Sequence, residues 1–247
     1  MEPEDAAFIG NYAILLSDIR KDYDKAEDYY KKLIELEPDN AAFIGNYAIF
    51  LSDIRKDYDK AEEYYKKVIE LQPDNEKNIG NYAIFLSDIR KDYDKAEDYY
   101  QKVIELQPDN AKNIGKYAIF LSDIRKDYDR AEEYYKKAIE LKPEDANNIC
   151  NYAHHLIISK HDFENAQKYI DQAFLKVGKD NESLAVKAEL WFYRYAHYKK
   201  WYKEGEHALE KLTTEGTKSI GWNFDQHIEI AKNNNHPNIQ KLQHSQT

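Results

Sequence analysis

One thiol and one imidazole in this chain have the spacing of a reactive pair. Cys150 and His154 are four residues apart, which places both side chains on one face of a helix. An imidazole beside a thiol can activate it as a nucleophile when a third group orients the ring. No Asn or Asp in that role can be identified from the sequence. We therefore predict no catalytic residue and interpret Cys150 as a small packing side chain.

Motifs for metals, cofactors and other nucleophiles are also missing. All eight histidines follow residue 150, but no two have the His-x-x-x-His spacing that holds a metal on a helix. His154 and His155 are adjacent and point to different helix faces. No Gly-rich phosphate loop, carboxylate pair or Ser-His-Asp frame stands out. We predict no metal, no cofactor and no enzymatic activity, and only the divergent region 146–247 leaves room for a hidden site.

The composition narrows the class of protein. A net charge of −10 repels phosphate backbones, so we predict no nucleic-acid partner. The single cysteine excludes an intramolecular disulfide and favours a reducing compartment. Met1–Asp5 is acidic and unlike a signal peptide, and no segment approaches the roughly 20 apolar residues that span a bilayer. We predict a cytoplasmic protein with no membrane partner.

An internal repeat determines the architecture. Residues 41–75 and 76–110 differ at only five of 35 positions, and a period of this length indicates stacked two-helix units. Prolines recur at the same spacing, at Pro3, Pro38, Pro73, Pro108 and Pro143.

Each unit contains two amphipathic stripes at helical spacing. In the second copy they are Ile44, Tyr47, Ala48 and Leu51, then Tyr58, Ala61, Tyr65 and Val68. Residues 52–57 have weaker apolar order and predict the turn. Asp59, with a glutamate three residues on, has capping-box spacing, so we expect the second helix to begin near it. Pro73 ends that helix, and Asn75 or its neighbour is expected to cap the next one.

The unit resembles a tetratricopeptide repeat. It contains Ile44-x-x-Tyr47-Ala48-x-x-Leu51, then Ala61-x-x-x-Tyr65, then Pro73, with one residue inserted between the helices. The resemblance covers residues 6–180 and continues more weakly beyond them. It implies an all-α, right-handed superhelical α-solenoid of stacked antiparallel helix pairs, in which each copy buries the stripes of its neighbour.

We expect one continuous solenoid. Residues 181–215 are predicted to form a degenerate, longer sixth helix pair, and residues 216–247 a capping helix with a polar tail. The N-terminal end lacks such a cap, so end-to-end homo-association through that uncapped face is a further prediction. Within residues 1–180 the five predicted repeats are 6–40, 41–75, 76–110, 111–145 and 146–180.

The resemblance also implies where a ligand lies. In the family, the first helices of successive repeats line a concave groove that takes extended peptides or partner helices. Family members that bind a carboxylate chain end use Lys and Asn at fixed groove positions. These positions are mostly Gly and Ile here, so we expect no carboxylate clamp. The candidate peptide-binding residues are Asn11, Asn46, Asn81, Lys116, Asn151, Ile49, Ile84, Ile119, His154, Ser52 and Ser87.

The asparagine column has two interpretations. By resemblance it could be a ladder that grips a peptide backbone, since an amide both donates and accepts, with Lys116 interrupting it. Alternatively, these asparagines hold neighbouring repeats together. An acidic column near the turn favours a basic or neutral ligand, although arginines two residues on could neutralise it. This column is Asp18, Asp53, Asp88 and Asp123.

Three classes of function remain. We predict a non-enzymatic protein–protein interaction scaffold that binds an extended peptide or a partner helix. The alternative is a structural or self-associating solenoid, recently amplified or designed, without a specific peptide ligand. RNA binding, known for 35-residue pentatricopeptide repeats, is opposed by the acidic charge and the Tyr-Tyr pair of each unit. The aromatic stretch Trp191–Tyr202 is expected to be core, with Tyr198 or Trp201 the most exposed.

Overall fold

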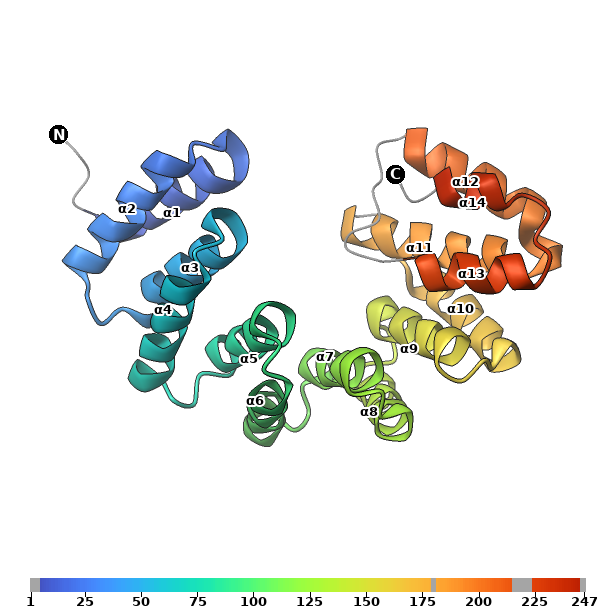
Figure 1. Cartoon of the computed structure of the whole chain (residues 1–247), viewed down its shortest axis with the longest axis horizontal. Helices are drawn as coiled ribbons and strands as arrows, with labels where there is room; N and C mark the ends of the chain where they lie inside the picture. Colours follow the sequence, from blue (N-terminus) through green and yellow to red (C-terminus); the bar gives the residue numbers. More distant parts are fainter. Residues whose placement is uncertain (1–4, 179–180, 215–223, 245–247) are drawn as a thin grey trace. The chain divides into compact units, whose positions relative to one another are not determined.

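The computed structural model describes residues 5–178, 181–214 and 224–244. Within these ranges every regular element is a helix, so the predicted all-α solenoid of stacked antiparallel helix pairs is confirmed (Figure 1). None of the described helices is long and apolar enough to cross a membrane. The chain forms two compact units: unit one is Met1–Pro108 and unit two is Asp109–Thr247.

Unit one consists of three nearly identical helix pairs. In each pair a ten-residue α-helix widens into a five-residue π-helix, and a fourteen-residue α-helix follows after a short turn. The elements are α1 (Ala6–Leu15), η1 (Leu16–Arg20), α2 (Tyr23–Leu36), α3 (Ala41–Phe50), η2 (Leu51–Arg55), α4 (Tyr58–Leu71), α5 (Glu76–Phe85), η3 (Leu86–Arg90) and α6 (Tyr93–Leu106).

Unit two begins with the same pattern and then departs from it. The first helix of the fifth repeat has 13 residues, and the first helix of the next pair has 17 residues. Residues 215–223, the start of the predicted capping segment, lie outside the described residues. The elements are α7 (Ala111–Phe120), η4 (Leu121–Arg125), α8 (Tyr128–Leu141), α9 (Ala146–Ile158), α10 (Phe163–Lys176), α11 (Asn181–His197), η5 (Lys199–Trp201), α12 (Tyr202–Thr214), α13 (Asp225–Asn233) and α14 (Ile239–His244).

The extra residue of the 35-residue repeat is absorbed by the π-helix. After α3 the backbone widens through Leu51–Arg55 and stops at Lys56, whose φ of 58° is left-handed. Asp57 then caps α4, its carboxylate accepting from the backbone N–H of Lys60 at 3.4 Å. Helix α4 thus starts near Asp59, as expected, but its capping residue is Asp57 and not Asp59. Most of the residues expected to form the turn lie in the π-helix η2, which keeps their backbone N–H and C=O groups hydrogen-bonded.

The prediction of the next cap is confirmed. The Asn75 side chain accepts from the backbone N–H of Asn78 at 3.1 Å and starts α5. The same arrangement recurs at Asn110, whose side chain accepts from the backbone N–H of Asn113 at 3.2 Å. Each cap satisfies one of the free N–H groups at a helix start.

Small residues let neighbouring first helices approach each other. A Cβ on Gly45 would lie 3.5 Å from Asn78 Oδ1, and one on Gly115 would lie only 2.2 Å from Asn148 Oδ1. Cys150 takes this position in the fifth repeat and is 1% exposed. The packing therefore excludes a side chain at Gly115, whereas a Cβ at Gly45 would make an ordinary van der Waals contact, and Cys150 continues this column as a buried side chain.

Tyrosine rings join successive repeats. Stacked pairs link the second helix of one repeat to the first helix of the next, with centroid separations of 5.7 or 5.8 Å, and this contact uses part of the unusually large tyrosine content. The three stacked pairs are Tyr30 with Tyr47, Tyr65 with Tyr82, and Tyr135 with Tyr152.

The arginines at the ends of η2 and η3 bind the preceding repeat. Arg55 Nη2 lies 2.6 Å from Asp24 and its Nε lies 2.7 Å from Glu27. Equivalent contacts recur one repeat later at Arg90. The arginines thus bind the preceding repeat and do not neutralise the acidic column, since Asp53 forms no ion pair among the described residues.

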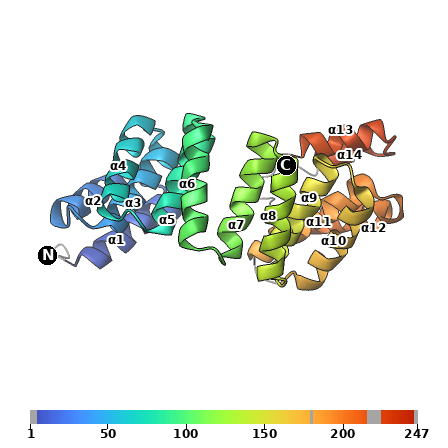
Figure 2. The same cartoon turned by 90° about the horizontal axis from the view of Figure 1, so that it is seen from below.

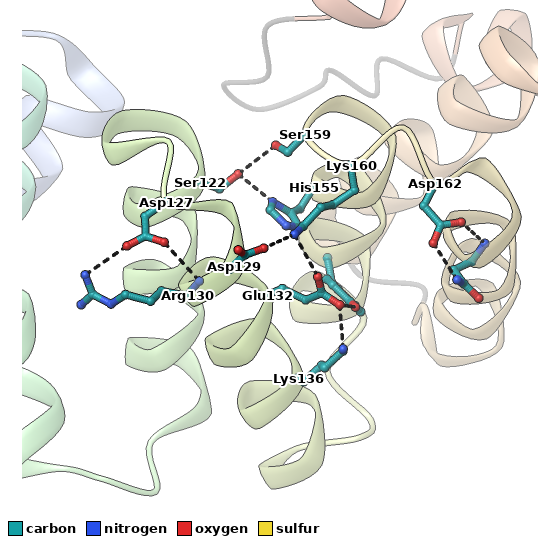
Figure 3. Close-up of polar contacts among 12 residues, drawn as sticks. Ser122, Asp127, Asp129, Arg130, Glu132, Lys136, His155, Ser159, Lys160 and Asp162 are labelled. Carbon is teal, nitrogen blue, oxygen red and sulfur yellow. Dashed lines mark hydrogen bonds and ion pairs between the residues drawn. The ribbon is translucent and has the colours of Figure 1, made fainter.

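In the fifth repeat, whose first helix has no following π-helix, a lysine takes this place. Lys160 Nζ lies 2.5 Å from Asp129 and 3.4 Å from Glu132 (Figure 3). Beside it, Ser122 Oγ and His155 Nδ1 are 2.9 Å apart, and His155 stands where the three preceding repeats have Phe. Both side chains are 1% exposed or less, so a substrate cannot reach this serine–histidine pair.

The described C-terminal helices lie beside the last helix pairs. Helix α13 contacts the first helices α9 and α11, as both views show (Figure 1, Figure 2). Phe224, directly before α13, stacks on Phe192 with centroids 4.0 Å apart. Helix α14 is joined to α12 by an ion pair between Lys241 and Glu206. The chain thus covers part of the first-helix face of unit two with its own helix.

The aromatic stretch of α11 is largely core, as predicted. Phe192, Tyr193 and Tyr195 are at most 1% exposed. Tyr198 and Trp201 are half-buried, and the Tyr198 hydroxyl donates to a backbone carbonyl at 2.8 Å. These rings therefore pack the last repeat and are not a free aromatic surface.

Candidate peptide-binding site

In unit one, the first helices of the second and third repeats border an open depression of about 360 Å³. Four of the predicted residues line it together: Ile49, Ser52, Asn81 and Ile84. The isoleucines are partly exposed and give the depression an apolar floor. Two acidic side chains, Asp53 and Asp88, also line the depression.

The other predicted residues of unit one lie apart from this depression. Asn46 is half-buried on α3, and Asn11 is exposed on α1. Ser87 does not line the depression and is only 2% exposed; Ser52, which does, is 3% exposed, so both hydroxyls belong to the interior more than to the surface.

Unit two contains two neighbouring depressions that share residues of α7 and α9. The first, of about 640 Å³, is lined by Lys116, Ile119 and Asn151 among others. The second, of about 820 Å³, shares Ile119 and Asn151, adds His154, and extends to Glu229 of α13. The structure therefore brings together all four residues predicted for this part of the chain.

The predicted asparagines have side-chain amides that are unused among the described residues. Asn11, Asn46, Asn81 and Asn151 form no side-chain hydrogen bond within the described part of the chain, whereas Asn148 Nδ2 donates to a backbone carbonyl of the preceding repeat at 3.4 Å. The four amides can thus donate to, and accept from, a bound peptide.

His154 is held by the chain's own C-terminal helix. Its Nδ1 lies 2.9 Å from His227 Nε2, and His227 Nδ1 lies 2.7 Å from His197 Nε2. Burial lowers the pKa of His154 to about 4 and that of His197 to about 3, and burial followed by the two neighbouring rings lowers the pKa of His227. At neutral pH the three rings are uncharged and tie α13 to α9 and α11.

His197 and His227 were not among the predicted site residues. The confinement of all histidines to the end of the chain was the available signal. It could not identify the contact, because the partners are 30 and 73 residues apart in sequence.

Cys150 is a poor nucleophile in this environment. Its Sγ lies 3.8 Å from a carboxylate oxygen of Glu189, and burial followed by that carboxylate raises the pKa of the thiol. The Nδ1 of His154, the imidazole four residues on, bonds to His227 Nε2. No group of three or more His, Cys, Asp and Glu side chains in the described ranges is placed to hold a metal ion.

Lys116 is the charged member of the predicted set. It is half-buried on α7, and burial followed by the neighbouring Lys112 lowers its pKa. Lys116 thus places an amine in this depression at the position where the other four repeats have a neutral asparagine amide.

Comparison with known proteins agrees with this architecture. The family model described as "TmcB, TPR repeats" matches residues 10–78 and 83–148. A search of the curated proteins finds no match. A tetratricopeptide repeat protein from Parabacteroides merdae superimposes with a TM-score of 0.68 at 16% identity, covering 100% of this chain and 86% of the other.

Two further solved structures share the fold. PilF of Pseudomonas aeruginosa has a TM-score of 0.64 at 17% identity, with 92% of this chain and 97% of that chain covered. YrrB, described as a tetratricopeptide-repeat protein with an unusual peptide-binding site, has a TM-score of 0.51 at 21% identity, with 74% and 92% covered. At these identities the likeness concerns the fold alone.

Proposed function

We propose, from the premise that this chain belongs to the tetratricopeptide-repeat family described as "TmcB, TPR repeats", that it is a non-enzymatic scaffold which binds an extended peptide along its first helices. Repeats of this family in general build protein-interaction scaffolds. One observation carries the proposal here: Asn46, Asn81 and Asn151 are half-buried, and their side-chain amides form no hydrogen bond among the described residues.

An extended peptide suits the chemistry of the depression in unit one. Asn81 can bond to a peptide group as a neighbouring strand would, because its amide offers both a donor and an acceptor. Ile49 and Ile84 can bury apolar side chains of the peptide, at about 25 cal/mol per Å² of apolar surface. YrrB, whose description names a peptide-binding site, is a precedent on the same fold.

The test removes the amides without disturbing the helices. Capped peptides of random sequence are arrayed to select a binder, and Asn46→Ala with Asn81→Ala is compared with the unchanged protein. Each lost hydrogen bond is worth about 1 kcal/mol, so we expect binding roughly tenfold weaker or more, with an unchanged melting temperature.

A helix-cap substitution is the matched control. Asn75→Ala removes an amide that caps α5, so it should lower the melting temperature and leave peptide affinity intact. If the double variant lowers stability while binding persists, the asparagines are structural and the proposal is wrong.

One observation favours the alternative of a self-associating solenoid. Phe8 and Ile19 are 55% and 73% exposed, whereas Phe43 and Ile54, at the same positions of the second repeat, are half-buried. Exposed apolar side chains of this size favour end-to-end association of copies. Sedimentation velocity over a wide concentration range tests this, with Phe8→Glu as the variant; a concentration-independent monomer would exclude it.

We also propose which class of partner the protein binds and in which compartment it lies. The partner is a protein or peptide and not a nucleic acid, because the chain carries a net charge of −10. A cytoplasmic location remains a prediction that rests on the single cysteine, which is buried as a free thiol.

A further inference from the structure

Two lysines line the depression of about 640 Å³ in unit two and lack anionic partners among the described residues. Lys112 and Lys116 lie one turn apart on α7, and neither forms an ion pair or hydrogen bond within the described part of the chain. The other two lysines that line this depression are already paired. These pairs are Lys142 with Asp145 at 3.2 Å and Lys176 with Glu144 at 2.8 Å.

Lys112 and Lys116 repel each other in the free protein. Like charges one helical turn apart destabilise a helix, and Lys116 is also half-buried, so its pKa is lowered first by burial and then by Lys112. A bound anion would relieve both costs. Only the fourth repeat carries lysine at both positions; the corresponding pairs are Ala7 and Asn11, Ala42 and Asn46, Lys77 and Asn81, and Asn147 and Asn151.

The opposite wall of the depression can hold a peptide backbone. Asn147 and Asn151 project from α9 into the same depression, and their side-chain amides have no hydrogen-bond partner in the described ranges. A peptide between the two helices would therefore meet amides on one side and ammonium groups on the other.

The spacing of the two cations selects one kind of anionic segment. Side chains one turn apart on a helix have Cβ atoms about 5–6 Å apart. In an extended chain, alternate residues lie on the same side and are about 6.5–7 Å apart. Two carboxylates separated by one residue can thus each reach one lysine, whereas the chain end of a non-acidic residue supplies one carboxylate for two separated cations.

We infer that this depression binds an internal acidic segment of an extended partner, with carboxylates at alternate residues directed to Lys112 and Lys116. The inference rests on the proposed function and names its ligand in unit two. It differs from the sequence-based expectation of a basic or neutral ligand, because the acidic column lies nearer the turns while these lysines lie nearer the start of α7.

Titration with defined peptides tests the inference. The probe is an acetylated and amidated peptide with Glu at alternate positions, and its matched controls carry Gln at those positions, or the same number of Glu placed side by side. We expect the alternating peptide to bind about tenfold more tightly than the Gln peptide, with affinity that falls as salt is added.

The second repeat of the chain already carries uncharged residues at the positions of these two lysines, and these residues serve as the substitutions. Lys116→Asn and Lys112→Ala introduce the residues found at these positions in the second repeat, and each should weaken binding of the alternating peptide about fivefold. Together they should abolish the preference over Gln. Lys77→Ala removes the same charge from the equivalent position of the third repeat and should leave this affinity unchanged.

Three outcomes would overturn the inference: equal affinity for the Glu and Gln peptides, an equal effect of Lys77→Ala, or binding that requires a free carboxylate chain end. If the Gln peptide binds as well and Asn147→Ala with Asn151→Ala weakens it, the proposed function survives without the acidic ligand. If no capped peptide of either charge binds, both are wrong.

Discussion

Acidification should loosen unit two through its buried histidines. His154, His227 and His197 are uncharged in the folded protein and join α13 to α9 and α11. An unfolded imidazole takes up a proton below pH 6.5, whereas the folded rings resist protonation. Because the folded pKa is the lower one, stability is complete above pH 6.5 and is lost as the pH falls toward the folded pKa.

The size of the effect follows from the shifted pKa values. With the pKa of His154 lowered to about 4 and that of His197 to about 3, moving from pH 7 to pH 5 removes about 2 kcal/mol of stability per ring. Protonation of the two rings together should therefore lower the free energy of unfolding by about 4 kcal/mol between pH 7 and pH 5, a large fraction of the stability of a typical domain.

Hydrogen exchange at single-residue level is the suitable assay. After correction for the intrinsic exchange rate at each pH, amides of α9, α11 and α13 should lose protection between pH 7 and pH 5. The helices of unit one provide an internal control, because this unit contains no histidine. His207→Gln, which changes an exposed histidine of α12, should leave the response of α13 unaltered.

An equal loss of amide protection in all helices between pH 7 and pH 5 would refute this role of the histidines. If α13 loses no more protection than α4 over this pH range, the imidazole chain does not hold the C-terminal helix. The same holds if replacing His227 by Gln leaves the pH midpoint of α13 opening unchanged.

Two further predictions concern packing and capping. Gly115→Ala should be about 2 kcal/mol less favourable than Gly45→Ala, since its Cβ would meet Asn148 Oδ1 at 2.2 Å and break a buried hydrogen bond; paired thermal unfolding curves measure this difference. Asp92→Ala should cost about 1 kcal/mol, because it removes the N-cap of α6, whereas Asp98→Ala on the exposed face of the same helix should change the unfolding free energy by less than about 0.5 kcal/mol.

The repeat frame could be predicted because it depends on local pattern. Apolar stripes recur in every copy, an Asp or Asn caps each of the first five first helices, and Asn75 caps its helix as expected. The cap of the second helix was assigned to Asp59 and not to Asp57 because both aspartates have the chemistry of a cap. The π-helix decides between them, and its backbone widening has no signature in side-chain periodicity.

The candidate site was predictable where it follows the repeat. Ile84 and Asn81 line one depression, and Ile119 and Asn151 line another, because equivalent positions of stacked copies lie side by side. The contact of His154 with His227 could not be predicted in this way, since it joins a repeat to a segment outside the repeat frame.

Half-buried asparagines of the first helices are proposed to grip a peptide backbone. The most direct measurement is the NMR signal of each side-chain amide during titration with a capped peptide that binds. The amides of Asn46, Asn81 and Asn151 should shift saturably, while those of Asn40 and Asn75, which bond to neighbouring side chains, should stay in place. Saturable binding that leaves the first three unmoved would contradict the account.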